Sequence, residues 1–290
     1  MAPYTLPQPT YRRSLQEAFH LRLFEANRTI IDESWNSRGV RSSFWRLYIN
    51  RASASASRPR KAAASIIVNR MPFPIPADHV CLVPAWVAFD CHCVGLVDHL
   101  YLHFDVLGLA AQRVRQLFPE PLLVGHVDTF GTSAPRLGEL LGGKANLSAT
   151  TICLAKAVAF EALSLALARM PESNHTRLMA ALQPEAAIHA AIQHIAAHLS
   201  QPLHNPTLAR LCHLSESQLV RQFRKVLGQT PAQYILDRRV THAAQALTFS
   251  DETIDQIARR FGFCDRYYFT RAFARRMGVP PAAYRKREVV

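Results

Sequence analysis

Two stretches near the carboxyl end of the chain carry arginine and hydroxyl side chains at the spacing of one helix face. In residues 216–227 and 266–277 large apolar residues recur every four positions, so the polar residues between them share the opposite face of each expected helix. The outward residues are Ser217, Val220, Arg221 and Arg224 in the first stretch, and Arg266, Tyr267, Thr270 and Arg271 in the second. The planar arginine fork can pair with guanine O6 and N7 or with phosphate, and hydroxyl groups can bond base edges. These residues are therefore candidate contacts to double-stranded DNA.

The two stretches belong to an internal repeat with an offset of 49 to 50 residues. The first copy contains Leu208, Ala209, Leu219, Arg221, Phe223, Gly228, Pro231 and Tyr234, and the second contains Ile257, Ala258, Phe269, Arg271, Phe273, Gly278, Pro281 and Tyr284. Each copy has the spacing of a helix-turn-helix unit, at about 204–228 and 253–278. Leu219 and Phe223 in one copy, and Phe269 and Phe273 in the other, are expected to point inward.

Turn and capping residues mark the ends of these expected helices. The tight turn falls at His213 in the first copy and at Gly262 in the second, and each is followed by an apolar residue, Leu214 or Phe263. The expected helix caps are Asn205 before Pro206, Ser215 with Gln218, Thr253 with Gln256, and Asp265. One helix from Thr230 to Leu247 joins the copies and would span about 25 Å. It can hold two recognition helices near the ~34 Å separation of successive major grooves on one DNA face.

The rest of the chain has a different pattern. Residues 40–105 carry short apolar or alternating runs, which predict strands at Phe44–Ile49, Ala64–Val68, Val80–Val83 and Leu100–Phe104. Residues 71–77 hold three prolines and are expected to be a turn. From about residue 107 the pattern is helical, at 106–117 and at 151–170. The second helix is apolar on nearly all sides, so it needs burial in its own domain or against a second subunit.

Composition and charge agree with a nucleic-acid partner. The chain has 290 residues, 34 Lys and Arg against 21 Asp and Glu, a net charge of +13 and 49% hydrophobic residues. The length suits two globular domains. The basic excess favours a polyanionic partner. Nucleic acid is the first candidate and an anionic membrane is the second. Residues 185–290 hold 15 Lys and Arg against 8 Asp and Glu and carry no strand pattern.

Several other classes of protein are disfavoured. The six cysteines form no CxxC pair, so neither a zinc finger nor a disulfide scaffold is expected. The first residues lack the apolar core of a secretory signal, and the apolar run from Val80 to Val97 is interrupted by Pro84, Asp90 and His92. We therefore expect a cytoplasmic protein with no membrane partner. No phosphate loop, nucleophile–base set or carboxylate pair is evident, so no enzyme and no cofactor is predicted.

The second copy resembles the DNA-binding domain of the AraC/XylS family of bacterial transcription regulators. The resemblance covers about residues 186–290 and is strongest in IARRFGFCDRYYFTRAF at 257–273, followed by Gly278, Pro281 and the Tyr284–Arg285 pair. Tyr234, Arg239, Ala243 and Leu247 match the pattern of the family's connecting helix. Two departures fall in the first copy, where His213 replaces the usual turn glycine and Val220 replaces a polar base contact. That copy is expected to read sequence weakly or through a thymine methyl group.

Residues 40–105 resemble, more loosely, the cupin-like sensor domain of the same family, through LVP at 82–84 and LYLHFD at 100–105. The resemblance implies an α+β protein of two domains. A cupin-like β-barrel with following helices would occupy 1–170, a linker 171–185 and the helical DNA-binding domain 186–290. It also implies a regulator, in the first instance an activator, with a small effector, a homodimer formed through the helices after the barrel, and a contact with RNA polymerase. The effector-binding residues are not predicted.

Two other functions stay open on the sequence. One is a constitutive regulator whose N-terminal domain only dimerises. The other is a cupin metalloenzyme fused to a DNA-binding domain, for which the available ligands would be Cys91, His92, Cys93, His99 and His103. For these residues a packed strand with reduced thiols is the simpler interpretation, and for Trp35, Trp45 and Trp86 core packing is simpler than an effector pocket. For Cys264 an ordinary turn residue is the preferred interpretation over a redox sensor. Residues 285–287 are either a phosphate clamp or a solvated tail.

Overall fold

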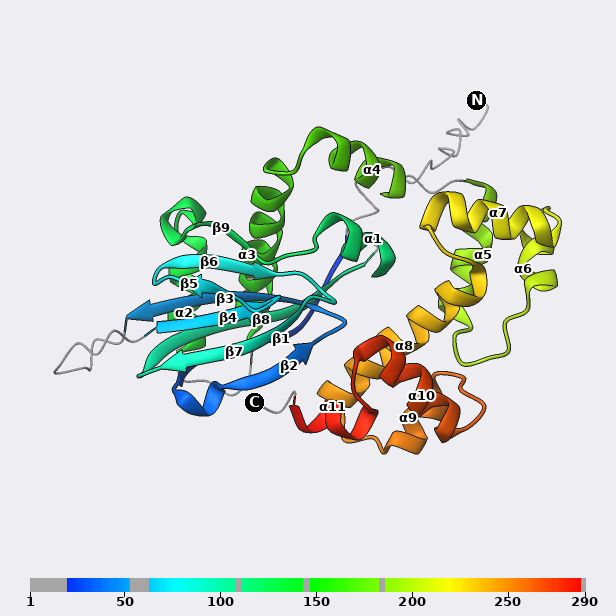
Figure 1. Cartoon of the computed structure of the whole chain (residues 1–290). Helices are drawn as coiled ribbons and strands as arrows, with labels where there is room; N and C mark the ends of the chain where they lie inside the picture. Colours follow the sequence, from blue (N-terminus) through cyan, green and yellow to red (C-terminus); the bar gives the residue numbers. More distant parts are fainter. Residues whose placement is uncertain (1–19, 53–62, 108–110, 143–146, 183–185, 288–290) are drawn as a thin grey trace, which may run out of the picture.

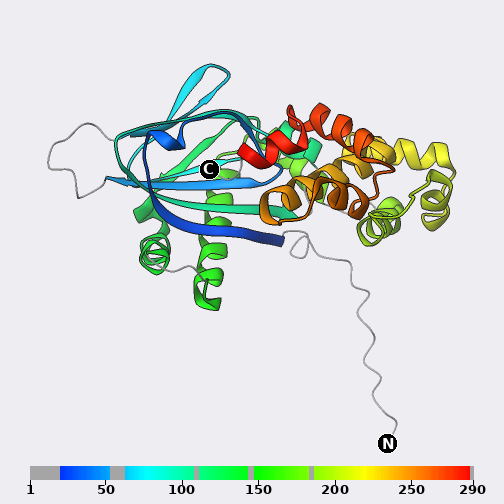
Figure 2. The same cartoon turned by 90° about the horizontal axis from the view of Figure 1, so that it is seen from below.

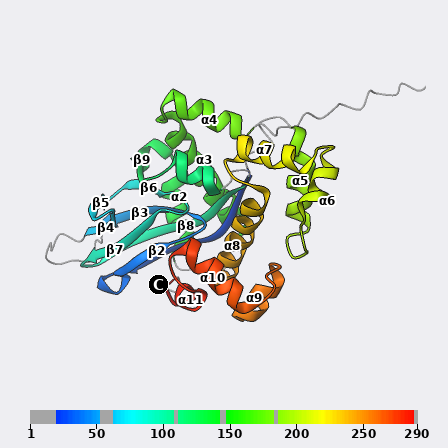
Figure 3. The same ribbon diagram turned by 45° about the vertical axis from the view of Figure 1, so that its right-hand side comes forward.

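The computed structural model describes residues 20–52, 63–107, 111–142, 147–182 and 186–287. In these ranges a sheet-rich N-terminal region, residues 20–182, is followed by a helical C-terminal region, residues 186–287 (Figure 1). The two regions lie against each other, with the longest helix of the C-terminal region beside the sheets (Figure 3).

The described strands form two antiparallel sheets that face each other (Figures 1 and 2). The five-stranded sheet has the order β1 (His20–Ile31), β8 (Val97–Leu107), β3 (Trp45–Ala52), β6 (His79–Val83) and β9 (Leu122–His126). The four-stranded sheet has the order β2 (Ser37–Arg41), β7 (Ala88–Val94), β4 (Ala63–Val68) and β5 (Met71–Ile75). This arrangement is a sandwich, and the described strands do not close into the barrel that the sequence predicted.

Alternate residues of the central strands enter two different cores. Trp45, Leu47 and Ile49 of β3 lie in a core that the five-stranded sheet shares with helices, whereas Tyr48 lies in the core between the sheets. Successive side chains of a strand point to opposite faces. A central strand covered on both faces is therefore mostly apolar, and the run at 44–49 could be recognised from sequence although it contains Arg46.

The structure confirms the four expected strands, as β3, β4, β6 and β8. The expectation of a turn at residues 71–77 was wrong, because Met71–Ile75 forms β5 at the edge of the four-stranded sheet. Proline has no N–H to donate, and an edge strand leaves one side of its backbone without a partner strand, so prolines are tolerated there. The expectation of helix from residue 107 onward was also incomplete, since residues 122–126 form β9.

Helices α1 (Ala111–Leu117), α2 (Ser133–Leu141) and α3 (Ala149–Ala168), with the 3-10 turn η3 (Val127–Phe130), share a core with the five-stranded sheet. Helix α4 (Glu172–Leu182) packs against α1 and α7, and the 3-10 turn η2 (Glu33–Trp35) lies against β7 of the four-stranded sheet. The apolar helix predicted at 151–170 is confirmed as α3, which packs against β1 and β9. Its length and mean hydropathy of 1.7 would by themselves also suit a membrane span. The segment expected as a linker contains α4, and residues 183–185 lie outside the described ranges.

The C-terminal region consists of helices, as the sequence predicts. They are α5 (Ala186–Ala197), α6 (Asn205–Leu211), α7 (Glu216–Leu227), α8 (Pro231–Phe249), α9 (Ile254–Arg260), α10 (Arg266–Met277) and α11 (Pro281–Arg287). The capping boxes of Ser215 with Gln218 and of Thr253 with Gln256 are both formed, and Asp265 caps α10. Asn205 is not the cap of α6, because the helix begins one residue earlier and His204 takes the cap position without a side-chain hydrogen bond.

Candidate nucleic-acid interface

The repeat folds into two pairs of helices with the same turn. We call α6 with α7 the first helical pair and α9 with α10 the second helical pair. The backbone N–H of Leu214 donates to the carbonyl of Ala209 at 2.9 Å, and that of Phe263 donates to Ala258 at 3.0 Å. Residues that match in the repeat therefore make matching turn hydrogen bonds.

Both turns need a left-handed backbone, and the two copies satisfy this need differently. Gly262 has φ of +73° and His213 has φ of +53°. A Cβ atom on Gly262 would lie 2.8 Å from the carbonyl oxygen of Leu199, so glycine is required there for space as well as for conformation. Histidine is one of the residues that enters this region more often than most. The turn at His213 is thus formed without the glycine that the family usually places there.

The inward residues of each second helix anchor it in its core, as expected. Leu219, Phe223, Phe269 and Phe273 are fully buried. The rings of Phe269 and Phe273 lie 5.5 Å apart in an edge-to-face contact, and Phe263 from the turn packs 4.8 Å from Phe269. These contacts fix the rotation of α7 and α10 about their own axes, which decides the residues that each helix presents to solvent.

The outward residues of α7 lie on an accessible surface. Ser217, Arg221 and Arg224 are exposed and Val220 is half-buried. A shallow hollow of about 530 Å³ runs over this face, and its lining residues are Asn205, Glu216, Ser217, Val220, Arg221 and Arg224. The four predicted residues of α7 are therefore brought together on one concave surface, with Glu216 as the acid among them.

The outward residues of α10 are also accessible. Arg266, Tyr267 and Arg271 are exposed, Tyr267 to 78% of its full area, and Thr270 is half-buried. The Arg266 guanidinium is paired at 3.2 Å with Asp255 of α9, a partner that the sequence analysis did not anticipate. Four-residue spacing assigns faces within one helix, but it does not show an ion pair between two helices.

The start of α10 is a second acidic point beside this face. The carboxylate of Asp265 accepts the backbone N–H of Tyr268 at 2.7 Å, and this hydrogen bond, with one from the Cys264 thiol, lowers the pKa of that carboxyl. Tyr268 is itself exposed and was not among the predicted contacts. Cys264 is exposed in the turn, as its interpretation as a turn residue requires.

The candidate metal ligands do not gather. Among the described residues no group of three His, Cys, Asp or Glu side chains could hold a metal ion. Cys91 and Cys93 are buried between the sheets, whereas His92 is exposed on the opposite face of β7. This placement matches the simpler interpretation of the segment as a packed strand.

The two histidines of β8 instead take part in a buried polar cluster between the sheets. His99 Nδ1 lies 2.7 Å from Asn50 Oδ1, and burial lowers the pKa of His99 to about 3. His103 Nδ1 lies 3.2 Å from Glu25, and its Nε2 lies 3.5 Å from the Arg46 guanidinium. Burial and the adjacent Arg46 charge lower the pKa of His103 to about 4. A guanidinium at this distance repels a further cation, which disfavours His103 as a metal ligand.

The remaining candidates are structural. Trp35, Trp45 and Trp86 are buried in the two cores of the N-terminal region. Arg285 donates to the carbonyl oxygens of Leu247 and Glu252, so it ties α11 to the end of α8. Lys286 stays exposed.

Duplicated helix pairs that expose arginine-rich second helices are the architecture of helix-turn-helix transcription regulators. A family model described as a helix-turn-helix domain matches residues 208–287. MarA, the multiple antibiotic resistance protein of Escherichia coli, is 36% identical over 98 residues, which are 34% of this chain and 77% of MarA. The chain belongs to the AraC/XylS family of transcription regulators, a family of DNA-binding proteins and not of enzymes.

Two other relatives match about a third of this chain. The MmsAB operon regulatory protein of Pseudomonas aeruginosa is 37% identical over 90 residues, which are 31% of this chain and 29% of that protein. The match to the activator RhaR of Klebsiella pneumoniae likewise spans 38% of that protein. A solved structure of ToxT from Vibrio cholerae covers 91% of this chain and 95% of ToxT, with a TM-score of 0.51 and 14% identity. This likeness shows that the sheet-rich and helical regions together form a known fold.

Proposed function

We propose that this protein is a sequence-specific transcription regulator that binds double-stranded DNA with α7 and α10. In this proposal residues 186–290 are the DNA-binding domain and the two helical pairs are its helix-turn-helix units. Residues 1–170 are a cupin-like sensor domain, and residues 171–185 connect the two. The observation that carries the proposal is that both copies of the repeat expose the same arginine-bearing face of their second helix.

The spacing of the two helical pairs supports simultaneous binding in adjacent major grooves. Helix α8 joins them and has 19 residues, so it is about 28 Å long. Successive major grooves on one face of DNA are about 34 Å apart. Arg221, Arg266 and Arg271 are the first candidates for base contacts, Val220 suits a thymine methyl group, and Ser217, Arg224, Tyr267 and Thr270 complete the two faces. Contacts to phosphate would supply most of the affinity and make it depend on salt.

A binding selection tests this proposal. Purified full-length protein is incubated with fragments of its own genome at two salt concentrations and with competitor DNA. We expect enrichment of a two-part motif whose half-elements lie about one helical turn apart. Binding that enriches no motif and is lost steeply with salt would mean charge-driven binding without sequence recognition.

We further propose that the N-terminal region senses a small effector. The polar cluster of Arg46, Tyr48, His99 and His103 lies between the sheets, where burial of polar groups costs stability. ToxT, which shares the fold, was solved with an unsaturated fatty acid bound. A rise in Tm with one member of a metabolite panel would support sensing. An unchanged Tm across the panel would favour the constitutive regulator instead.

The outer face of α3 supports a homodimer. Cys153, Ala157, Phe160, Ser164 and Ala168 are exposed along one side of this helix, and Phe160 is exposed to 40%. An apolar helix face of this kind is stabilised by covering it with another protein surface, and a second copy supplies an identical face. A cytoplasmic location and a contact with RNA polymerase are part of the same proposal.

A further inference from the structure

The two helical pairs have different cores. Val240, Ala243 and Leu247 of α8 belong to the same continuous core as Trp86 and Val114 of the N-terminal region, and this core extends to α10 through Phe269 and Phe273. The first helical pair packs in a separate core with α5 and the start of α8, through residues such as Phe223 and Ile235. The second helical pair therefore shares its interior with the N-terminal region, and the first does not.

A buried carboxylate on α8 lies beside the core that this helix shares with the N-terminal region. Asp237 is 6% exposed and accepts a hydrogen bond from Nε of Arg276, which is in the last turn of α10. Its other carboxylate oxygen lies 3.8 Å from Nη2 of Arg115 in α1. One side chain thus holds an arginine from the second helical pair and an arginine from the N-terminal region.

A third arginine closes this group of charges. Arg41 of β2 donates to the backbone carbonyl of Arg276 at 3.4 Å. Burial lowers the pKa of Arg115, Asp237 opposes that change, and the repulsion from Arg276 and Arg41 lowers the pKa further. We call Asp237, Arg276, Arg115 and Arg41 the Asp237 junction. Without its carboxylate, three guanidinium groups from three elements would face one another.

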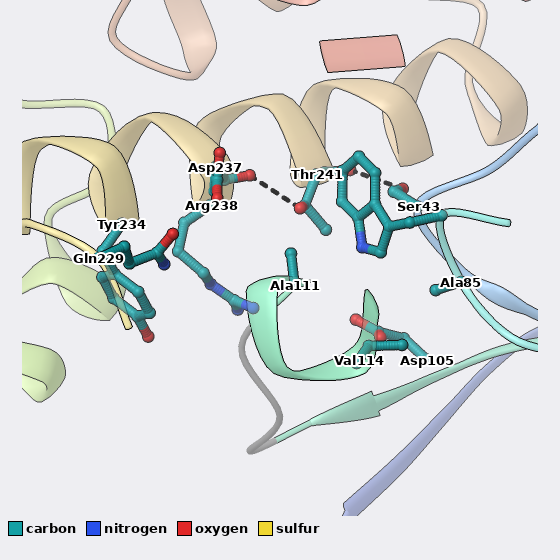
Figure 4. A pocket seen from close by; sticks show the side chains of 11 residues that line it. Ser43, Ala85, Asp105, Ala111, Val114, Gln229, Tyr234, Asp237, Arg238 and Thr241 are labelled. Carbon is teal, nitrogen blue, oxygen red and sulfur yellow. Dashed lines mark hydrogen bonds between the residues drawn. The ribbon is translucent and has the colours of Figure 1, made fainter. Parts of the chain in front are cut away.

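Further contacts on the same side reinforce the connection. The ring of Phe249, at the end of α8, stacks on Phe24 at 5.0 Å and lies 5.4 Å from Phe44. Ser43 donates to the carbonyl oxygen of Thr241 at 3.2 Å, a bond drawn in the close-up of this interface (Figure 4). A partly open cavity of about 20 Å³, roughly the size of one water molecule, lies between α8 and α1.

The first helical pair meets the N-terminal region at one end of α7. Arg113 of α1 donates to the carbonyl oxygen of Val226 at 2.9 Å, and Gln112 lies beside Gly228. Arg113 therefore reaches the first helical pair, whereas Arg115 of the same helix reaches Asp237 of α8, which holds Arg276 of the second helical pair. Substitution of Arg113 or of Arg115 can therefore disrupt one of these two connections at a time.

We propose that Asp237 is a positioning residue that couples the N-terminal region to the second helical pair, so that these two parts move as one body. The first helical pair is then the part whose position can vary relative to that body. The inference rests on the proposed function, since it assigns to the two recognition helices different roles in regulation. An effector that reshapes the N-terminal region would act on α10 through the shared core and the Asp237 junction, and on α7 through α8, Arg113 and the contact of α4 with α7.

Hydrogen exchange on the full-length protein, free of DNA, tests the coupling. The variant Arg115→Met keeps an unbranched apolar side chain and removes the charge, and with it the contact of the guanidinium with the Trp86 ring at 5.2 Å. We expect exchange in α10 and in the second half of α8 to rise about threefold to fivefold, with α6 and α7 unchanged. Arg115→Lys is expected to restore the slow exchange, because it returns the charge to the junction.

Two controls make the outcome decisive. Arg113→Met is expected to raise exchange in α7 and to leave α10 unchanged. Asp237→Asn removes the charge that pairs with both Arg276 and Arg115. It is therefore expected to raise exchange in α10 more than Arg115→Met does. An Arg115→Met protein whose α10 exchanges at the wild-type rate, or whose α7 loosens as much as α10, would overturn the coupling. Because no DNA is used, failure of the binding selection would refute the proposed function and leave this measurement interpretable.

Discussion

At the scale of single residues, the turn positions show how two copies of one motif meet the same backbone requirement. Gly262 fits beneath the carbonyl oxygens of Leu199 and Ser200, whereas His213 holds a left-handed conformation with its side chain exposed. The second copy therefore requires glycine at this position of the repeat because no other residue fits. The first copy tolerates a histidine in a strained backbone conformation.

Substitutions at these turns should change stability in opposite directions. Gly262→Ala is expected to lower the free energy of unfolding by about 2 kcal/mol or more, because its Cβ would overlap backbone atoms. His213→Gly is expected to raise the free energy of unfolding by about 0.5–1 kcal/mol, since glycine enters the left-handed region without strain. Urea denaturation of both variants measures the difference, and equal destabilisation by both would contradict this account.

The buried histidines predict a dependence of stability on pH. Their pKa values in the folded protein, about 3 for His99 and about 4 for His103, lie below the ordinary value of 6.5. The unfolded chain therefore binds more protons between pH 6.5 and 4, so folding stability is full above pH 6.5 and falls as the pH is lowered. For His103 the loss by pH 4 is on the order of 3 kcal/mol.

Denaturation midpoints at pH 7, 5.5 and 4.5 measure this effect. His103→Gln keeps a polar side chain but cannot titrate, so the variant is expected to show a shallower fall in stability than the wild type over that range. Wild-type and variant curves that fall in parallel would show that His103 is not responsible.

At the scale of elements, the exposed side of α3 gives a test of assembly. Phe160→Glu is expected to convert a dimer to a monomer, because a carboxylate would have to be buried in the proposed interface without a partner. Met71→Glu, at an apolar residue of β5 that is 70% exposed, makes the same change of charge away from α3 and is the matched control. Sedimentation velocity at several concentrations distinguishes the two states. A Phe160→Glu protein that remains dimeric would place the interface elsewhere.

The elements differ in how far sequence could predict them, and each difference has a physical reason. The C-terminal helices were predicted to within one or two residues because their capping boxes and glycine ends act locally. β5 was missed because its prolines are acceptable only at an edge, and edge position depends on the whole sheet. The outward faces of α7 and α10 followed from helical spacing. The Arg266–Asp255 pair and the Asp237 junction depend on packing between elements and carried no local signal.

At the scale of the whole molecule, the net charge and the arrangement of the cores have different roles in DNA binding. The net charge of +13 provides attraction to DNA that does not depend on sequence. The shared core attaches the second helical pair to the N-terminal region. The first helical pair has a separate core and is joined to that region through α8, Arg113 and the contact of α4 with α7. Under the proposed function, specific recognition requires both arginine-bearing faces to meet their base pairs together.

The most direct test of the central claim, that α7 and α10 each read one half-element, is the affinity of Arg221→Ala and Arg271→Ala for the selected DNA and for versions altered in one half-element. Each variant should lose about 1–3 kcal/mol on the intact site and become indifferent to changes in its own half-element only. Equal losses on specific and random DNA, or the same tolerance pattern for both variants, would contradict the claim that these helices recognise sequence separately.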